Sequence, residues 1–348
     1  MSGGLVVFRA DASPTIGGGH VMRCLTLADA LYRRGARCVF LSGPETTAIV
    51  PALAAAPHRV IEASGPDLDP GTVAAEVGRP EWLVVDSYAL DATFERPFRA
   101  AGIRVCVIDD MADRPHDCDL LLDQTLGRRE EDYRALVPPD ACRLLGPGNA
   151  LLRPQFAAAR PSALARRTAP ALRRVLVSLG AGDVGTSMAP VLDGLCASRL
   201  DLTVDVVLGA AGTLDPDVLQ RVRRKGLDIA LHHEVRDMAA LMVEADLAIG
   251  GGGTSSWERC CLGLPALVVT IADNQNLIVK NLCAAGAIRS LGRLDRLSPA
   301  AVAAEVTRLA AAPAALAAMS RAGAAVCDGL GAERMAHLLL GQRPAEPE

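Results

Sequence analysis

Residues 5–20 read Leu-Val-Val-Phe-Arg-Ala-Asp-Ala-Ser-Pro-Thr-Ile-Gly-Gly-Gly-His, an apolar strand that runs into a glycine-rich turn. An amphipathic pattern over residues 21–34 follows at once and predicts a helix. The same succession of a short apolar run and a helical pattern recurs along the chain. Such alternation is typical of parallel sheets covered by helices on both faces, so we expect the α/β class. In open sheets of this class ligands bind at the carboxyl ends of the strands.

The predicted strands form two groups, one in each half of the chain. A length of 348 residues also suits two domains better than one core. We therefore expect two Rossmann-like domains with parallel sheets that face a central cleft. The strands expected in the two halves are 5–9, 37–42, 82–87, 104–109 and 119–123, then 174–179, 203–208, 229–232, 247–250 and 266–271.

The expected boundaries follow composition. The N-terminal domain covers residues 1–160, and the Pro-, Ala- and Arg-rich stretch 161–174 is expected to be a linker. The C-terminal domain covers residues 175–341, and the Pro- and Glu-rich tail 342–348 is expected to be disordered.

Composition favours a small-molecule substrate. The net charge is −4 and only 3% of the residues are aromatic, which disfavours nucleic acid as a partner. Arg9 and Asp11 interrupt the first apolar run, so it does not fit a signal peptide, and no run is long enough for membrane insertion. We expect a cytoplasmic protein. The ten cysteines include no C-x-x-C pair, and several lie in apolar segments where a free cysteine packs as a small hydrophobe.

The first glycine turn contains a candidate general base. Gly17, Gly18 and Gly19 permit a close approach of a ligand to the backbone, and His20 falls near the start of the following helix. The positive end of the helix dipole disfavours imidazolium there, which leaves the ring able to accept a proton. Arg9 and Asp11 precede the turn, and Asp11 is the expected partner of the imidazole. The alternative is an ordinary tight turn with a capping histidine.

A second strand-to-helix turn, Leu247-Ala-Ile-Gly-Gly-Gly-Gly-Thr-Ser-Ser-Trp-Glu258, is a candidate diphosphate site. Backbone N–H groups and hydroxyls are the donors that phosphates prefer, and Glu258 could bind ribose hydroxyls. The alternative is a helix cap with glycines required by packing. The expected UDP-binding residues are Gly251, Gly252, Gly253, Thr254, Ser255, Ser256 and Glu258.

Three further strand ends offer substrate contacts. Gly180 lies in a shorter glycine turn, Tyr88 follows the strand that ends near Asp86, and Asn274 offers an amide to sugar hydroxyls or N-acetyl groups. Each has a plain structural alternative, such as half-buried packing for Tyr88 and a helix cap for Asn274.

We expect no metal and no cofactor. The segments 116–118 and 232–234 contain histidines, but neither has a second ligand group at a usable spacing. Asp109, Asp110 and Asp113 follow a strand, where one carboxylate could aid catalysis, although capping and solvation explain them equally well.

Several long motifs give the chain a resemblance to a known family. They are RADAS (9–13), IGGGHVMRCLTLA (16–28), VVDSY (84–88), VIDDMADRPHDCDLLLDQ (107–124), LLRPQFA (151–157), GGGTSSWERCCLGLPALV (251–268) and ADNQN (272–276). In this order the chain resembles the UDP-2,4-diacetamido-2,4,6-trideoxy-β-L-altropyranose hydrolases of pseudaminic acid biosynthesis, the PseG family.

The resemblance implies a GT-B fold like that of MurG-type glycosyltransferases, and a UDP-sugar and water as substrates. It implies that His20 is the general base, that Tyr88 and Asn274 contact the sugar, and that UDP binds on the C-terminal domain. Ala181 departs from the family, in which a second glycine is frequent, and adds a methyl group there. We expect hydrolysis by attack of water at the anomeric carbon with inversion, and we expect the protein to be a monomer. A GT-B glycosyltransferase, a hydrolysing UDP-sugar 2-epimerase and a catalytically silent nucleotide-sugar binding module remain as alternatives.

Overall fold

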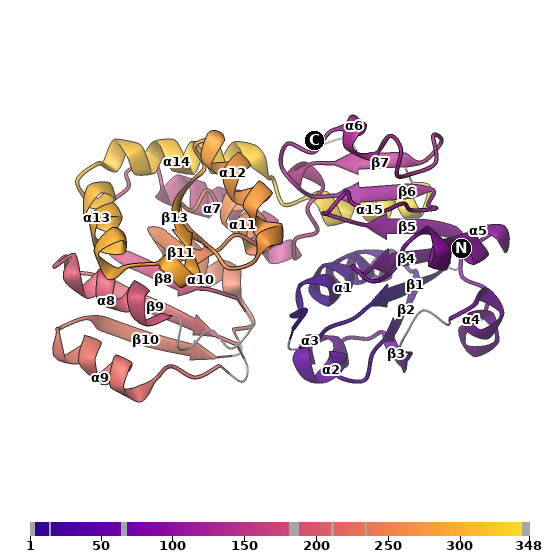
Figure 1. Cartoon of the computed structure of the whole chain (residues 1–348), viewed down its shortest axis with the longest axis horizontal. Helices are drawn as coiled ribbons and strands as arrows, with labels where there is room; N and C mark the ends of the chain where they lie inside the picture. Colours follow the sequence, from indigo (N-terminus) through magenta and orange to yellow (C-terminus); the bar gives the residue numbers. More distant parts are fainter. Residues whose placement is uncertain are drawn as a thin grey trace. The chain divides into compact units, whose positions relative to one another are not determined.

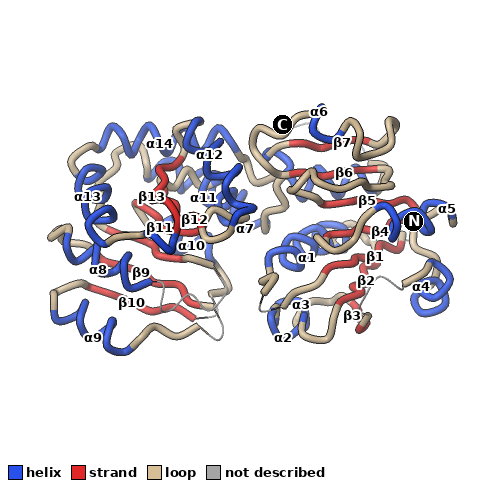
Figure 2. The backbone as a smooth tube through the Cα atoms, viewed as in Figure 1, coloured by secondary structure: helices blue, strands red, loops and turns tan. Residues whose placement is uncertain are grey.

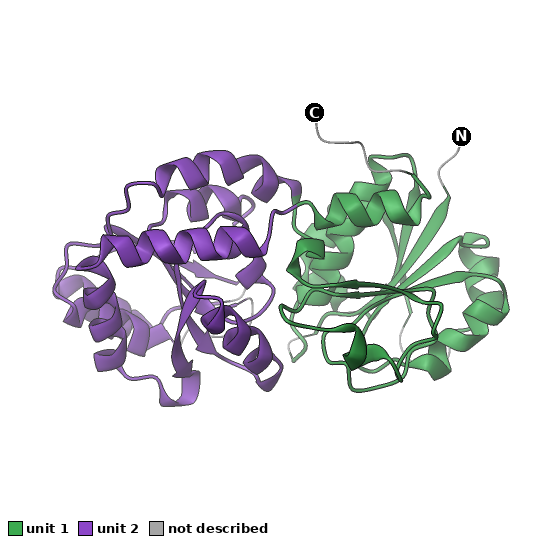
Figure 3. Ribbon diagram, turned by 90° about the horizontal axis from the view of Figure 1, so that it is seen from above, with its two compact units in different colours: residues 1–153, 330–348 green, residues 154–329 purple. Residues whose placement is uncertain are grey.

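A computed structural model describes residues 4–13, 15–63, 68–180, 188–209, 212–233 and 235–342. The chain divides into two compact units (Figure 3). Unit 1 comprises Met1–Arg153 and Leu330–Glu348, and unit 2 comprises Pro154–Gly329.

Unit 1 contains a seven-stranded parallel sheet in the order β3-β2-β1-β4-β5-β6-β7 (Figure 1). Its strands are β1 Leu5–Ala10, β2 Arg37–Ser42, β3 Arg59–Glu62, β4 Trp82–Asp86, β5 Arg104–Ile108, β6 Leu120–Asp123 and β7 Cys142–Leu145. Its helices are α1 Gly19–Tyr32, α2 Thr46–Ile49, α3 Pro51–Ala54, α4 Pro70–Val77, α5 Ala92–Ala100, α6 Glu130–Tyr133, the 3₁₀ turn η1 Pro147–Asn149 and α15 Gly331–Leu339.

Both faces of this sheet are buried. Val6 and Phe8 belong to one hydrophobic cluster, which also takes side chains from α1 and α15, whereas Leu5 and Val7 belong to a second cluster with residues of α4 and α5. Successive residues of a strand point to opposite faces, so a central strand covered on both sides must be apolar throughout. All six residues of β1 are buried, and five of them are apolar; the exception, Arg9, forms an ion pair with Asp11.

Unit 2 contains a six-stranded parallel sheet in the order β10-β9-β8-β11-β12-β13 (Figure 2). Its strands are β8 Arg174–Ser178, β9 Thr203–Leu208, β10 Asp228–His233, β11 Leu247–Gly251, β12 Ala266–Thr270 and β13 Ile288–Arg293. Its helices are α7 Pro154–Arg166, α8 Ala189–Ala197, α9 Pro216–Arg224, α10 Met238–Glu244, α11 Ser255–Cys261, α12 Asn276–Ala284, α13 Pro299–Ala310 and α14 Pro313–Val326, with 3₁₀ turns η3 Asp273–Gln275 and η4 Leu294–Arg296.

Each sheet reverses its strand order at one point. In unit 1 this switch lies between β1 and β4, and in unit 2 it lies between β8 and β11. Connections leave the sheet in opposite directions there, which opens a crevice beyond the carboxyl ends of the two strands. The turn with His20 follows β1, and the four-glycine turn follows β11. Both candidate sites therefore lie at switch points.

The α/β prediction is confirmed, with two parallel-sheet units. Three strands that the sequence did not indicate, β3, β7 and β13, lie at sheet edges. Edge strands are partly exposed, so they lack the continuous apolar run that identified the central strands. That the two sheets face a common cleft stays a prediction.

The observed division differs from the expected domain boundaries in two places. The expected linker, residues 161–174, is in part the helix α7, which packs within unit 2 against α10 and α11. The segment after residue 329 returns to unit 1, where α15 buries Met335 and Leu339 and the Trp82 indole donates to the Leu339 carbonyl at 2.8 Å. Amino-acid composition reveals neither the helix in the expected linker nor the return of the chain to unit 1, because both segments are ordinary helices. The tail 343–348 lies outside the described residues.

Among the described residues, no single helix is long and apolar enough to cross a membrane. One bent pair, Pro299–Ala310 with Pro313–Leu339, passes the same test by length and composition only, with an angle of 97° at the break.

All ten cysteines are free, and this gives a first prediction. Burial raises the pKa of the Cys38, Cys260 and Cys327 thiols to about 12, whereas Cys142 is exposed. Since the thiolate is the reactive form, we expect a colorimetric disulfide reagent at pH 8 to label one thiol rapidly and the buried ones only after unfolding in urea. The Cys142→Ser variant should lose the fast phase. A fast phase that persists in this variant would contradict the assignment.

Candidate active site

The glycine turn after β1 places His20 at the second position of α1. Gly18 is the N-cap of this helix, and a Cβ on it would lie 2.9 Å from a methyl carbon of Val50. Gly17 has a φ of 77°, which favours glycine, and its N–H donates to the Ser13 carbonyl at 2.7 Å. Gly19 is the first helical residue. The glycines therefore shape the backbone that presents His20.

A buried carboxylate holds the His20 ring. His20 Nδ1 lies 2.5 Å from Asp86 Oδ1, and the relative exposure of the two residues is 7% and 0%. An ionised carboxylate can only accept, so Nδ1–H is the donor and Nε2 keeps its lone pair. Asp86 is the last residue of β4, the strand beside β1 at the switch point. The tautomer fixed in this way is the one that a general base at Nε2 requires.

Arg23 keeps Asp86 ionised. Its Nε and Nη2 atoms donate to the two Asp86 oxygens at 2.6 and 2.7 Å, a bidentate pair. Burial by itself raises the pKa of the Asp86 carboxyl, but the charge and hydrogen bonds of Arg23 and His20 outweigh it, and this pKa lies well below its ordinary value. The carboxylate therefore stays charged although it is fully buried.

Tyr88 and Asp110 extend this network. Arg23 Nη1 donates to Asp110 Oδ2 at 3.0 Å, and the Tyr88 hydroxyl donates to Asp110 Oδ1 at 2.9 Å. The rings of Tyr88 and His20 meet edge to face, with centroids 4.5 Å apart and planes at 89°. Tyr88 is 40% exposed. It therefore lies directly against the imidazole, with part of its ring open to solvent.

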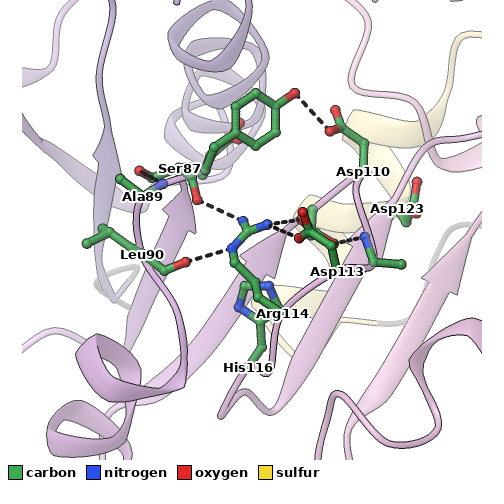
Figure 4. Close-up of polar contacts among 12 residues, drawn as sticks. Ser87, Ala89, Leu90, Asp110, Asp113, Arg114, His116 and Asp123 are labelled. Carbon is green, nitrogen blue, oxygen red and sulfur yellow. Dashed lines mark hydrogen bonds and ion pairs between the residues drawn. The ribbon is translucent and has the colours of Figure 1, made fainter. Parts of the chain in front are cut away.

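Arg114 secures the segment that presents Tyr88 (Figure 4). Its Nε donates to the Leu90 carbonyl at 3.0 Å and its Nη2 to the Ser87 carbonyl at 2.9 Å, while Nη1 contacts Asp113. The same guanidinium forms an ion pair with the buried Asp109 at 3.0 Å. Of the three clustered aspartates, Asp110 joins the His20 network, whereas Asp109 and Asp113 anchor Arg114.

Asp11 does not contact the imidazole as predicted. Its carboxylate pairs with Arg9 Nη1 at 2.6 Å and accepts the Gly43 N–H at 2.7 Å. Arg9 is only 3% exposed. Asp11 is therefore held beside β1 and β2, and Asp86 is the carboxylate that contacts the imidazole. Both Asp11 and Asp86 follow or end a strand, and only the sheet order distinguishes them.

In unit 2, tight packing explains three of the four glycines after β11. A Cβ on Gly250 would lie 2.6 Å from Arg259 Nη1, one on Gly251 2.9 Å from Ile271 Cδ1, and one on Gly252 2.5 Å from Val279 Cγ2. A Cβ on Gly253 would come only within 3.8 Å of Gln275. Gly253 is therefore the glycine of this turn at which a side chain would make only an ordinary van der Waals contact.

Gln275 and Arg259 fix the conformation of this loop. Gln275 Oε1 accepts the Gly252 N–H at 3.1 Å and the Ile271 N–H at 3.0 Å, which ties the loop to the end of β12. Arg259 Nη2 donates to the Gly251 carbonyl at 2.6 Å. These hydrogen bonds tie the loop to the end of β12 and to α11.

The remaining predicted residues lie at the same edge of unit 2. Thr254 is the N-cap of α11, Ser255 and Ser256 begin it, and Glu258 lies within it, half-buried. Asn274 is exposed in η3. Gly180, with a φ of 126°, follows β8, and a Cβ on it would meet no described residue within 4 Å. Ala181 lies outside the described residues.

No group of His, Cys, Asp and Glu in the described ranges could hold a metal ion. His116 instead pairs with Glu95, and His232 with Asp205.

The sequence analysis assigned no role to three residues of these sites, Asp86, Arg23 and Gln275, and it named Asp110 only as one of three possible carboxylates. Arg23 had a usable signal, because a residue three positions after His20 lies on the same helix face. Asp86 stands two positions before the predicted Tyr88, but its contact with a residue 66 positions away depends on strand order.

Solved structures identify the fold. The chain is similar to MurG of Acinetobacter baumannii, with a TM-score of 0.70, 14% identity, and 97% of this chain and 100% of that chain covered. It is also similar to UDP-GlcNAc 2-epimerase of Neisseria meningitidis bound to UDP-GlcNAc, with a TM-score of 0.62, 12% identity, and coverage of 97% and 100%. The chain has the GT-B fold. The spinosyn rhamnosyltransferase SpnG, complexed with thymidine diphosphate, shares this GT-B fold at a TM-score of 0.63 and 18% identity over 96% of this chain and 99% of that one.

Curated relatives of this GT-B chain are more similar in sequence. It is 28% identical to the spore coat polysaccharide biosynthesis protein SpsG of Bacillus subtilis over 198 residues, 56% of this chain and 57% of that protein. It is 30% identical to the UDP-2,4-diacetamido-2,4,6-trideoxy-beta-L-altropyranose hydrolase of Campylobacter jejuni over 152 residues, 43% of this chain and 53% of that protein. The GT-B chain thus spans about half the length of the curated relatives it matches. No family model matches it.

Proposed function

We propose that the protein hydrolyses a UDP-linked 2,4-diacetamido-2,4,6-trideoxy sugar to UDP and the free sugar. The observation that carries this proposal is the His20–Asp86 pair at the switch point of unit 1, a buried dyad with Nε2 available as a base. The 30% identity to the hydrolase of Campylobacter jejuni supports the substrate class. We further propose that the protein acts as a monomer in the cytoplasm, in nonulosonic acid biosynthesis.

The reaction is a displacement at the anomeric carbon with inversion. His20 Nε2 takes a proton from a water molecule while the oxygen of that water forms a bond to C1. At the same time the bond from C1 to the β-phosphate oxygen breaks. Both electrons of that bond leave with UDP. Asp86 stabilises the imidazolium that forms, since its carboxylate accepts the Nδ1 hydrogen bond. UDP is a good leaving group, so the mechanism requires neither a strong acid nor a metal.

Each part of the substrate has assigned residues in this proposal. The loop of Gly251–Ser256 and Glu258 bind UDP, while Gly180 and Asn274 contact the sugar. Tyr88 contacts the sugar near C1, because its ring lies against His20 and is partly exposed.

A GT-B glycosyltransferase and a hydrolysing 2-epimerase are the alternatives, since the spinosyn rhamnosyltransferase SpnG and a UDP-GlcNAc 2-epimerase share the fold. One experiment separates all three. The protein is incubated without acceptor with a panel of UDP-diacetamido sugars, and anomer-resolved NMR follows the products. We expect release of UDP and a free sugar with inverted C1 and unchanged C2. Inversion at C2 would indicate an epimerase, and no turnover of any UDP-sugar until an acceptor is added would indicate a transferase.

A further inference from the structure

Arg259 is a buried charge that no ion pair explains. It lies in α11 and is 3% exposed. Its hydrogen bonds go to the Gly251 carbonyl at 2.6 Å and to the hydroxyls of Ser256 at 3.0 Å and Ser255 at 3.3 Å. Its Nε atom is buried without a partner, and Arg259 is in none of the ion pairs of the described residues. Burial lowers the pKa of Arg259 and outweighs the charge of the neighbouring Glu258, which favours the guanidinium. Buried charges in proteins are normally paired, so this one requires a reason.

The guanidinium lies directly beneath the four-glycine loop. A Cβ on Gly250 would come within 2.6 Å of Arg259 Nη1, so the glycine at that position makes room for the charge. The three acceptors of Arg259 all belong to the loop or to the hydroxyls that follow it. The positive charge therefore lies next to the Gly251–Ser256 loop, where the sequence predicts a phosphate site.

The contacts also set the direction of the hydroxyl hydrogens. Ser255 Oγ and Ser256 Oγ each accept a hydrogen bond from a guanidinium that can only donate. Each hydroxyl keeps its own hydrogen for another acceptor. Ser255 is only half-buried, so a ligand at the loop can accept that hydrogen bond.

We propose that Arg259 is the residue that makes the Gly251–Ser256 loop selective for a diphosphate. It acts from behind the loop, by its charge and by orienting the Ser255 hydroxyl as a donor. The ligand class is the diphosphate of a nucleoside diphosphate, so the inference rests on the UDP site of the proposed function. An anion at the loop compensates the buried charge, and this attraction is strong because little water separates the two.

Arg167 provides a matched control within unit 2. It is also buried, at 5% exposure, and it donates to the carbonyls of Ala163, Met242 and Ala245 at 2.6–3.0 Å. These carbonyls lie at the C-terminal ends of α7 and α10, where the negative end of the helix dipole favours a cation. Ala245 precedes β11, so Arg167 lies at the amino edge of the sheet, away from the loop that follows this strand.

The test measures the affinity of the full chain for UDP and for uridine, by calorimetry and by ligand-observed NMR. We expect Arg259→Met to weaken UDP binding by about 10- to 100-fold, the range of a lost charge-assisted interaction, and to change uridine binding by less than about twofold. Arg259→Gln also removes the charge but keeps an N–H donor, and it carries the test if the Met variant does not fold. Arg167→Met should bind UDP as the wild type does.

Two outcomes would overturn the inference. One is a UDP affinity equal to that of the wild type in folded Arg259→Met or, if that variant does not fold, in Arg259→Gln. The other is an equal loss for uridine and UDP, which would show that Arg259 only supports the loop. A wild-type chain that binds UDP but hydrolyses no UDP-sugar would contradict the proposed function and leave the role of Arg259 intact.

Discussion

His20→Asn should lower turnover of the UDP-sugar by about 10²- to 10⁴-fold, the usual contribution of a general base. The substitution removes Nε2 as a proton acceptor and affects no residue assigned to UDP. We therefore expect kcat to fall while the affinity for UDP, measured by calorimetry, stays within about twofold of the wild type.

The matched control is His58→Asn. His58 is buried to the same degree as His20, at 7% exposure, and its Nε2 also pairs with a carboxylate, that of Asp29, at 2.8 Å. This variant shows how the loss of a buried histidine of unit 1, away from the proposed site, affects kcat. We expect near-normal kcat for this variant at a temperature where it is folded. Equal turnover of His20→Asn and the wild type would rule out His20 as the base.

Asp86→Asn should affect both activity and stability. An amide offers its oxygen or its N–H₂ to Nδ1, so the tautomer with a free Nε2 is no longer enforced, and we expect kcat to fall by about 10²- to 10⁴-fold. The change also leaves the buried Arg23 without its bidentate partner. Breaking a buried pair in this way costs about 3–5 kcal/mol, which urea unfolding at pH 7 should detect.

The stability effect of Asp86 should depend on pH with a definite sign. The pKa of Asp86 is lowered in the folded state, so its ionisation stabilises the fold above its unfolded pKa of about 4. This contribution is lost as the pH falls below that value toward the folded pKa. The difference in unfolding free energy between the wild type and Asp86→Asn should therefore be constant near pH 7 and shrink below about pH 4.

Asp29→Asn is the control for this variant, because its carboxylate serves a histidine outside the network and is partly exposed. It should keep near-normal kcat. A folded Asp86→Asn protein with wild-type kcat would show that the carboxylate does not position the base.

The sequence predicted those features that depend on local pattern. Central strands such as β1 were recognised because burial on both faces requires a largely apolar run, which in β1 only Arg9 interrupts. The glycine turn and the position of His20 were recognised because a strand, a flexible turn and a helix follow one another directly.

Features that depend on strand order could not be predicted from spacing. Asp86 reaches His20 because β4 lies beside β1, although two other strands separate them in the chain. Asp11 was the nearer carboxylate in sequence but is held by Arg9. Arg259 follows Glu258 directly, and the sequence alone does not show whether its guanidinium is buried or exposed to solvent.

The return of α15 to unit 1 has a consequence for synthesis on the ribosome. Unit 2 is one continuous segment and can fold as soon as residue 329 has emerged. The sheet that carries His20 and Asp86 is translated first, but it cannot cover the face beneath Met335 and Leu339 until α15 has been made. The His20–Asp86 pair thus lies in the unit whose core is completed last. On a ribosome stalled within unit 2, unit 1 would have an exposed apolar face.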